Sequence, residues 1–163
     1  FLGGTGKIAV VSSAIASENN NYYVQVRETE FADFIHKEYP DIEIITTLDS
    51  FEDPQITYEK TVKLLRDYQD LQGIYITCGG VSQVGRALEE SGRAKDIRVI
   101  SFEDYPEVVD LIRKDVIDCT LAGELQQQGE IPVQIIMDYL VFGKEPEQQQ
   151  IFTDIRVLVK ESL

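Results

Sequence analysis

The stretch that indicates the fold most clearly is Gly73-Ile-Tyr-Ile-Thr-Cys-Gly-Gly-Val-Ser-Gln-Val-Gly-Arg-Ala-Leu88. It begins as a short apolar run of β-forming residues, stops at the pair Gly79-Gly80, and continues at once with the apolar spacing of a helix. A second such run, Arg98–Phe102, stops at the acidic pair Glu103-Asp104. Because parallel α/β sheets bind ligands just beyond the carboxyl ends of their strands, these two ends predict a site for a polar small molecule.

Strands and helices are expected to alternate along the whole chain. Apolar runs predict strands at Lys7–Val11, Ile42–Thr47, Ile74–Thr77, Ile97–Ser101, Val116–Thr120 and Ile151–Val159. Helical spacing predicts helices at Val24–Glu38, Pro54–Leu65, Val81–Glu90, Pro106–Asp115 and Gln126–Phe142. This alternation predicts an α/β fold with a parallel sheet and helices on both faces. Pro132, inside the last helical pattern, is expected to kink that helix or delay its start.

Length and charge limit the possible functions. With 163 residues, 43% of them apolar, the chain fits one globular domain. The formal net charge is −14, from 29 acidic and 15 basic residues. Such a surface repels a phosphate backbone, so any contact with DNA is expected outside these residues. No apolar run approaches the roughly 20 residues of a membrane span, and no membrane partner is expected.

The scarcity of cysteine and histidine argues against catalysis and metal binding. Cys78 and Cys119 are the only cysteines, their spacing fits no metal motif, and the only histidine, His36, is expected on the surface. A helix N-terminus after Cys78 could activate its thiol, but Arg86 stands too far along the chain for a Cys-x5-Arg phosphatase loop. We therefore expect no enzyme activity, cofactor or metal. Only two cysteines, without motif spacing, also predict a reducing, cytoplasmic location.

Several motifs follow one another from the beginning of the chain to its end. They are Gly6–Val11, Arg27–Phe31, Asp70–Tyr75 with Gly79-Gly80 and Gly85–Leu88, Val99–Asp104, Pro106–Ile112, Ile117–Thr120, Asp138–Pro146, Thr153–Val157 and Lys160–Leu163. In this order they resemble the effector-binding domain of lactose-repressor (LacI/GalR) type transcription regulators. These regulators share the fold of type I periplasmic sugar-binding proteins such as ribose-binding protein.

The resemblance implies one lobe of a two-lobed, type I periplasmic-binding-protein-like domain. Residues 1–122 would form the core lobe, and residues 123–163 a helix and return strand that cross to the other lobe. The implied function is to sense a small effector (a sugar, sugar acid or glycoside) and so modulate operator binding by a helix-turn-helix outside this sequence. A homodimer is also implied, with contacts near Tyr58 or Val84. The alternative is a periplasmic or lipoprotein sugar-binding protein of an ABC transporter.

Two ligand-binding residues are implied most directly by the resemblance. Arg27 falls where the family has an arginine that contacts the ligand, and its guanidinium can donate parallel hydrogen bonds to hydroxyls or a carboxylate. The alternative is a surface arginine paired with Glu28 or Glu30. Glu103 falls on the family's sugar-binding aspartate, and a carboxylate can accept from two neighbouring hydroxyls. The alternative is a solvated acid that caps the helix at Pro106.

Other positions depart from the family pattern. Gly79 replaces a ligand-binding asparagine, and Gly123 stands where sugar binders often have glutamine, so that Glu124 next to it is a candidate replacement. Phe51 is expected either to stack on a sugar ring or to pack on the following helix. Tyr23, four residues before Arg27, faces the same way on the helix and is a further candidate.

Overall fold

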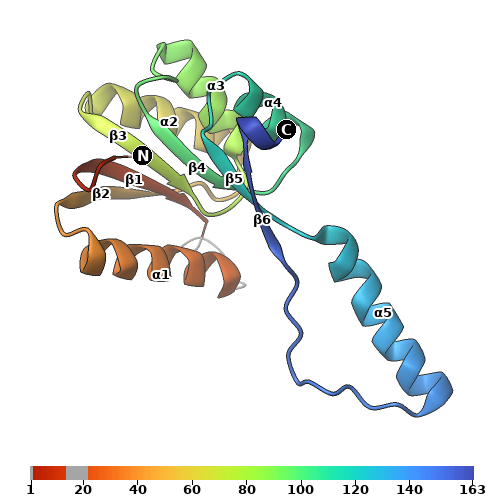
Figure 1. Ribbon diagram of the computed structural model, residues 1–163. Helices are drawn as coiled ribbons and strands as arrows, with labels where there is room; N and C mark the ends of the chain where they lie inside the picture. The colour runs from red at the N-terminus through yellow and green to blue at the C-terminus, as the bar shows by residue number, and fades with distance from the viewer. Residues whose placement is uncertain (1, 14–21) are drawn as a thin grey trace.

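The computed structural model describes residues 2–13 and 22–163. In these residues a six-stranded sheet has the order β2-β1-β3-β4-β5-β6 (Figure 1). Its strands are β1 (Gly6–Ser12), β2 (Ile42–Asp49), β3 (Leu71–Ile76), β4 (Arg98–Phe102), β5 (Cys119–Gly123) and β6 (Ile155–Val159). The helices are α1 (Tyr22–Glu38), α2 (Pro54–Asp67), α3 (Val81–Ser91), α4 (Pro106–Arg113) and α5 (Leu125–Phe142), followed by a short 3-10 turn at Lys160–Ser162. The sequence also predicts that the loop through Ser17 and Asn19 supplies N-cap residues for the first helix, but both lie outside the described residues.

Strands β1 to β5 are parallel, which confirms the expected doubly covered α/β sheet. The last strand is different, because β6 runs antiparallel to β5. Its prediction as Ile151–Val159 was too long. Ile155 pairs with Gly123, the last residue of β5, so earlier residues have no strand to pair with.

The fifth strand was predicted at Val116–Thr120, but it begins at Cys119. A side chain accounts for the shift. The carboxylate of Asp118 accepts a hydrogen bond from the Val99 amide at 2.7 Å, and the Asp118 amide donates to the Val99 carbonyl at 3.1 Å. The regular ladder therefore starts one residue later, and Val116 and Ile117 serve as buried core residues.

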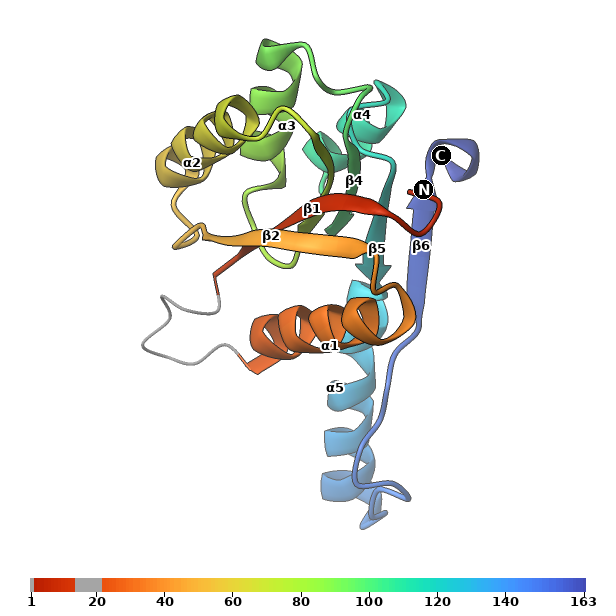
Figure 2. The same cartoon turned by 90° about the vertical axis from the view of Figure 1, so that its left-hand side faces the viewer.

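Helices cover the two faces of the sheet unequally. Helices α2, α3 and α4 lie on one face and α1 on the other, below β1 and β2 (Figures 1 and 2). The main core lies between the sheet and the three-helix layer. Val84 of α3 is 0% exposed within this core, so Val84 itself cannot form the implied dimer contact, and a contact near Tyr58 stays a prediction. The α1 face holds smaller clusters, centred on Ile8 and on Val10, Tyr75 and Phe102.

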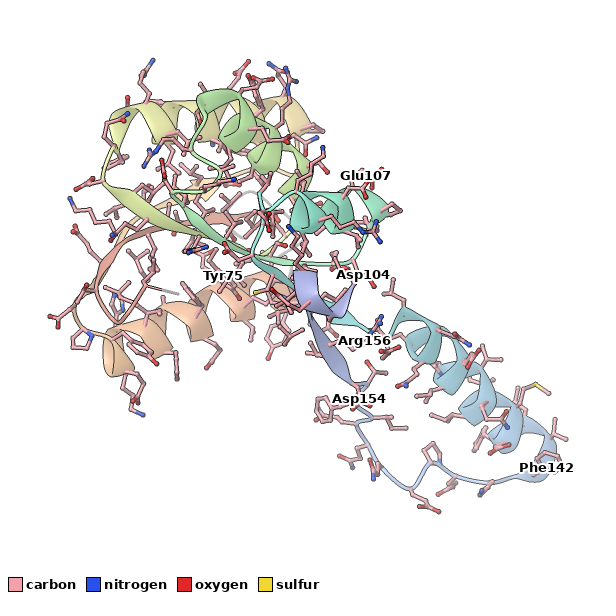
Figure 3. All side chains as sticks on the ribbon, turned by 45° about the horizontal axis from the view of Figure 1, so that its top comes forward. Tyr75, Asp104, Glu107, Phe142, Asp154 and Arg156 are labelled. Carbon is pink, nitrogen blue, oxygen red and sulfur yellow. The ribbon has the colours of Figure 1, made fainter. Side chains whose placement is uncertain are left out.

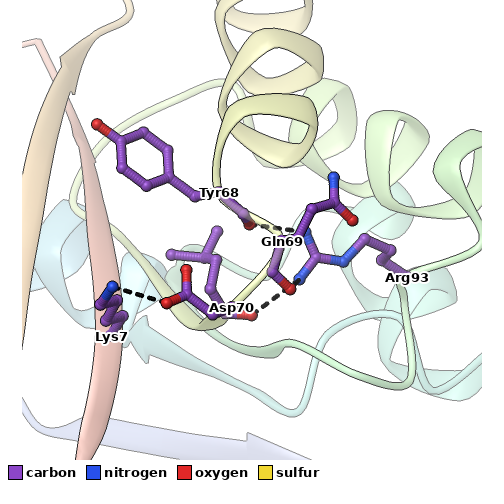
Figure 4. A network of polar contacts seen from close by, with 6 residues as sticks. Lys7, Tyr68, Gln69, Asp70 and Arg93 are labelled. Carbon is purple, nitrogen blue, oxygen red and sulfur yellow. Dashed lines mark hydrogen bonds and ion pairs between the residues drawn. The ribbon is translucent and has the colours of Figure 1, made fainter.

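A single arginine joins α2 to the sheet. The Arg93 guanidinium donates hydrogen bonds of 3.0 Å to the carbonyls of Leu65, Tyr68, Gln69 and Leu71. Figure 4 shows Arg93 beside Tyr68 and Gln69. These carbonyls lie at the end of α2 and at the start of β3, where a helix leaves its last carbonyls without intrahelical partners. Nearby, Lys7 pairs with Asp70 at 2.6 Å. The contacts hold the turn that leads into β3.

Helix α5 extends away from the rest of the molecule (Figure 1). It has no buried residue, and Leu140 and Phe142 are 72% and 75% exposed. The helix begins at Leu125 and continues through Pro132, so the expectation that Pro132 would delay its start was wrong. Water can hydrate the carbonyl that lacks its N–H partner, because Gln128 and Pro132 are both exposed. None of the described helices has both the length and the apolar character of a membrane span.

Candidate ligand-binding site

A large cavity opens at the carboxyl ends of β4 and β5. Its volume is about 1240 Å³, and Tyr23, Arg27, Glu103 and Gly123 are among its lining residues. The remaining lining comes mainly from apolar and glutamine side chains of α5 and of residues 150–155. The structure therefore brings Arg27 and Glu103 to one cavity, as the parallel strand order requires.

Arg27 is held by a carbonyl and an aromatic ring. Its Nη1 donates to the carbonyl oxygen of Thr77 at 3.0 Å, and its Cζ lies 3.8 Å from the centroid of the Phe102 ring. The alternative of an ion pair with Glu28 or Glu30 was wrong, because no such pair occurs among the described residues. A guanidinium has five N–H donors, so most of them stay available for a ligand in the cavity.

An aromatic stack supports the ring under Arg27. The Phe102 ring meets Tyr75 edge to face with centroids 6.0 Å apart, and Tyr75 stacks on Phe31 of α1 with centroids 4.0 Å apart. Burial raises the pKa of Tyr75 to about 12, although the nearby Arg27 charge acts to lower it. Tyr75 therefore stays neutral at physiological pH. The stacked rings hold Phe102 in place, and Phe102 in turn supports the Arg27 guanidinium from the side of the sheet.

Glu103 has an unusual backbone and a free carboxylate. Its φ is 74°, in the left-handed region. Its amide donates to the Leu121 carbonyl at 2.9 Å, and its carbonyl accepts from the Thr120 hydroxyl at 2.6 Å. In the described part of the chain, no hydrogen bond or ion pair engages its carboxylate. Capping of α4 was a wrong alternative, because Tyr105 is the N-cap and no side chain caps that helix.

Residues 1–145 match the family model of the periplasmic binding protein domain. The chain belongs to this family. Three solved structures are similar in three dimensions. GanP, a glucose-galactose binding protein from Geobacillus stearothermophilus, is 22% identical with a TM-score of 0.84, and the match covers 98% of this chain and 55% of GanP. A sugar ABC transporter (sugar-binding protein) from Bacillus halodurans is 27% identical (TM-score 0.81; 97% of this chain, 56% of that chain), and AraP, an arabinose binding protein from G. stearothermophilus, is 23% identical (TM-score 0.80; 97% of this chain, 55% of that chain).

This periplasmic-binding-protein domain thus spans about 55% of the length of those structures. It corresponds to one lobe of the fold. A search of curated protein sequences found no match.

A network of charges lies beside the cavity of this periplasmic-binding-protein domain. Arg156 of β6 contacts the carboxylate of Asp104 at 3.4 Å (Figure 3). It also contacts the carboxylate of Glu124 at 2.6 Å. Glu124 was a candidate to replace the polar group that Gly123 lacks. Its carboxylate is engaged by Arg156 and it does not line the cavity, so it is a poor free acceptor for a ligand.

A glutamine that sequence reasoning missed occupies the space beside Gly123. A Cβ at Gly123 would lie 2.7 Å from the Gln128 side-chain nitrogen, and that nitrogen lies 3.4 Å from the Thr153 hydroxyl. Gln128 of α5 therefore places a side-chain amide beside Gly123, which has no side chain of its own. The glutamine cluster at 126–128 was the only local signal for it.

The other expected ligand residues are distributed unevenly. Tyr23 lines the cavity and is 74% exposed, so its ring is accessible. Phe51 does not line it, and its ring lies 4.6 Å from the Lys60 ammonium in an exposed turn. Gly79 is also outside the lining, with open space where a side chain would stand. The ligand-binding roles of Phe51 and Gly79 stay predictions.

The cysteines offer little chemistry. Both thiols are free and buried, and burial together with the charge of Asp118 raises the pKa of Cys119. Cys78 lies 3.5 Å from the Ser50 hydroxyl, inside the protein. His36 is exposed, as expected. Across residues 2–13 and 22–163, no group of three or more His, Cys, Asp or Glu side chains is placed to hold a metal ion.

Proposed function

We propose that this domain is one lobe of a sugar-binding receptor that supplies an ABC transporter. The observation that carries the proposal is the convergence of Arg27 and Glu103 on one cavity at the carboxyl edge of the sheet. The family assignment supports it, as does the structure at 27% identity, which is described as a sugar ABC transporter's sugar-binding protein.

The two side chains suit the hydroxyl groups of a sugar. Each hydroxyl both donates and accepts, and the Arg27 guanidinium offers donors whereas the Glu103 carboxylate offers acceptors. Hydrogen bonds to such charged groups are shorter and stronger than bonds between neutral groups. Tyr23 adds an aromatic face that can pack on the apolar side of a ring. The same residues suit a sugar acid, because Arg27 can also donate to a carboxylate, and a glycoside, because its sugar ring keeps most of its hydroxyls.

One observation favours the regulator alternative. Both cysteines are unpaired, which fits the reducing cytoplasm in which a LacI-type regulator acts. The cytoplasmic location, the homodimer and operator binding stay predictions that belong to this alternative. The full-length sequence separates the two functions, because a signal peptide indicates a receptor and a helix-turn-helix indicates a regulator.

The test is a thermal-shift screen of the full-length protein against D-glucose, D-galactose, D-arabinose, D-fucose, their uronic acids and simple glycosides. At least one sugar should raise the melting temperature and bind in calorimetry. Arg27→Ala should weaken that binding about 30- to 150-fold, which corresponds to about 2–3 kcal/mol. Arg66→Ala is the matched control, because Arg66 is an exposed arginine paired only with Asp67. If no compound in the panel binds the folded protein, the proposed function is wrong.

A further inference from the structure

The backbone of Glu103 is held in a conformation that its own residue type disfavours. Of the described non-glycine residues, Glu103 is one of four with positive φ, together with Phe51, Glu52 and Asp115. A residue with a Cβ keeps such a φ only where its surroundings hold it there. Glu103 is also the one of these four that lines the ligand cavity.

Strand β5 holds both backbone groups of Glu103. The pairing of β4 with β5 ends at Phe102 opposite Leu121, and the Glu103 amide continues it by donating to the Leu121 carbonyl at 2.9 Å. The carbonyl of Glu103 instead accepts from the Thr120 side chain at 2.6 Å. Thr120 is 0% exposed, so its hydroxyl is shielded from bulk water.

The side-chain bond replaces a ladder bond that the turned backbone cannot make. In a continued parallel strand, the carbonyl of Glu103 would accept from a backbone amide of β5. The left-handed turn removes it from that ladder, and the Thr120 hydroxyl satisfies it. The turn also changes the direction of the Cα–Cβ bond, and therefore of the carboxylate. The next side chain, Asp104, is tied to Arg156, so the chain is held on both sides of Glu103.

We propose that Thr120 is a positioning residue of the ligand site, because its hydroxyl holds Glu103 in the left-handed conformation that presents the carboxylate to the cavity. The proposal rests on the proposed function, since it assigns Glu103 to ligand binding. Thr120 does not line the cavity, and it acts on a ligand only through Glu103. If Thr120 had only a structural role, its replacement would lower stability, and its effect on ligand binding would not depend on the Glu103 carboxylate.

The binding test uses the full-length protein with D-galactose, D-arabinose and D-fucose as probes in calorimetry. Thr120→Val keeps the shape of the side chain and removes the hydroxyl, and it should raise Kd about 10-fold, whereas Thr120→Ser should stay within about twofold of the wild type. In a Glu103→Ala background, Thr120→Val should change Kd by less than about twofold. Equal effects of Thr120→Val with and without the Glu103 carboxylate would overturn the proposal.

A second measurement does not depend on any sugar. In a crystal structure of ligand-free Thr120→Val protein, Glu103 should move to a negative φ, whereas Thr120→Ser should keep the left-handed value. A positive φ at Glu103 in Thr120→Val overturns the proposal whatever the binding data show. If φ changes but no probe binds the wild type, the positioning by Thr120 stands and the proposed function is what fails.

Discussion

Replacing the half-buried Arg93 should destabilise the domain more than replacing any exposed arginine, because its guanidinium satisfies four carbonyls at once. The carbonyls of Leu65 and Leu71 are partly buried, whereas those of Tyr68 and Gln69 are exposed and can bind water instead. A hydrogen bond to a charged group contributes about 1.5–3 kcal/mol net. Counting only the two partly buried bonds at the lower value, Arg93→Met should lower the free energy of unfolding by about 3 kcal/mol.

The assay is urea unfolding followed by circular dichroism, with thermal unfolding as a second measure. A loss of about 3 kcal/mol in a domain of this size corresponds to a fall in melting temperature of about 6–12 °C. Arg93→Lys should lose about half as much, since one ammonium cannot span all the carbonyls. Arg66→Met is the control and should lose less than about 1 kcal/mol. If Arg93→Met also loses less than about 1 kcal/mol, the reasoning from buried carbonyls is refuted.

Two further predictions concern packing and pH. Gly85→Ala should destabilise the domain by about 1–3 kcal/mol in urea unfolding, because its Cβ would lie 2.6 Å from a Leu111 methyl carbon. Gly79→Ala is the control and should lose less than about 1 kcal/mol, because nothing lies within 4 Å of a Cβ there. Similar losses in both variants would contradict this prediction. The folded-state pKa of Tyr75 is raised from 10.0 to about 12, so its neutral form stabilises the fold fully below pH 10.0 and that contribution is lost as pH rises through about 12. The stability of Tyr75→Phe should therefore fall less steeply than that of the wild type over this pH range, and parallel curves would show that Tyr75 does not contribute.

Helix α5 exposes large apolar side chains to solvent. Val133, Ile136 and Leu140 are 61%, 56% and 72% exposed, although all three are large and apolar. Solvent-exposed apolar stripes of this kind usually mark an interface. The division into a core lobe at 1–122 and a crossing segment at 123–163 stays a prediction.

Local pattern was a good guide to the elements from β1 to α4. Short apolar runs bounded by glycine, proline or acids specify both the type and the order of an element, because burial and backbone geometry act on neighbouring residues. The start of α3 is an example. Gly80 has φ 95°, and a Cβ there would lie 2.8 Å from the Thr57 side chain, so the glycine that signals the turn is also required by the packing.

The errors at β5 and β6 have a common origin. Residues 116–118 have strand-like composition, but the Asp118 carboxylate takes the place of a backbone partner for Val99. Residues 151–154 are also strand-like, and they lie beyond the last residue of β5 that could pair with them. In both cases the pairing depends on a neighbouring strand, which no local window of sequence contains.

The candidate site, too, could be predicted from the sequence only in part. The strand order and the two family motifs were enough to name Arg27 and Glu103 and to expect them at one edge of the sheet. The Thr77 carbonyl and Phe102 ring that hold Arg27, the Thr120 hydroxyl that turns Glu103, and the Gln128 amide beside Gly123 became evident in three dimensions. Each of these contacts joins residues from different elements, and its strength depends on distances of a few ångströms that are set by packing across the sheet.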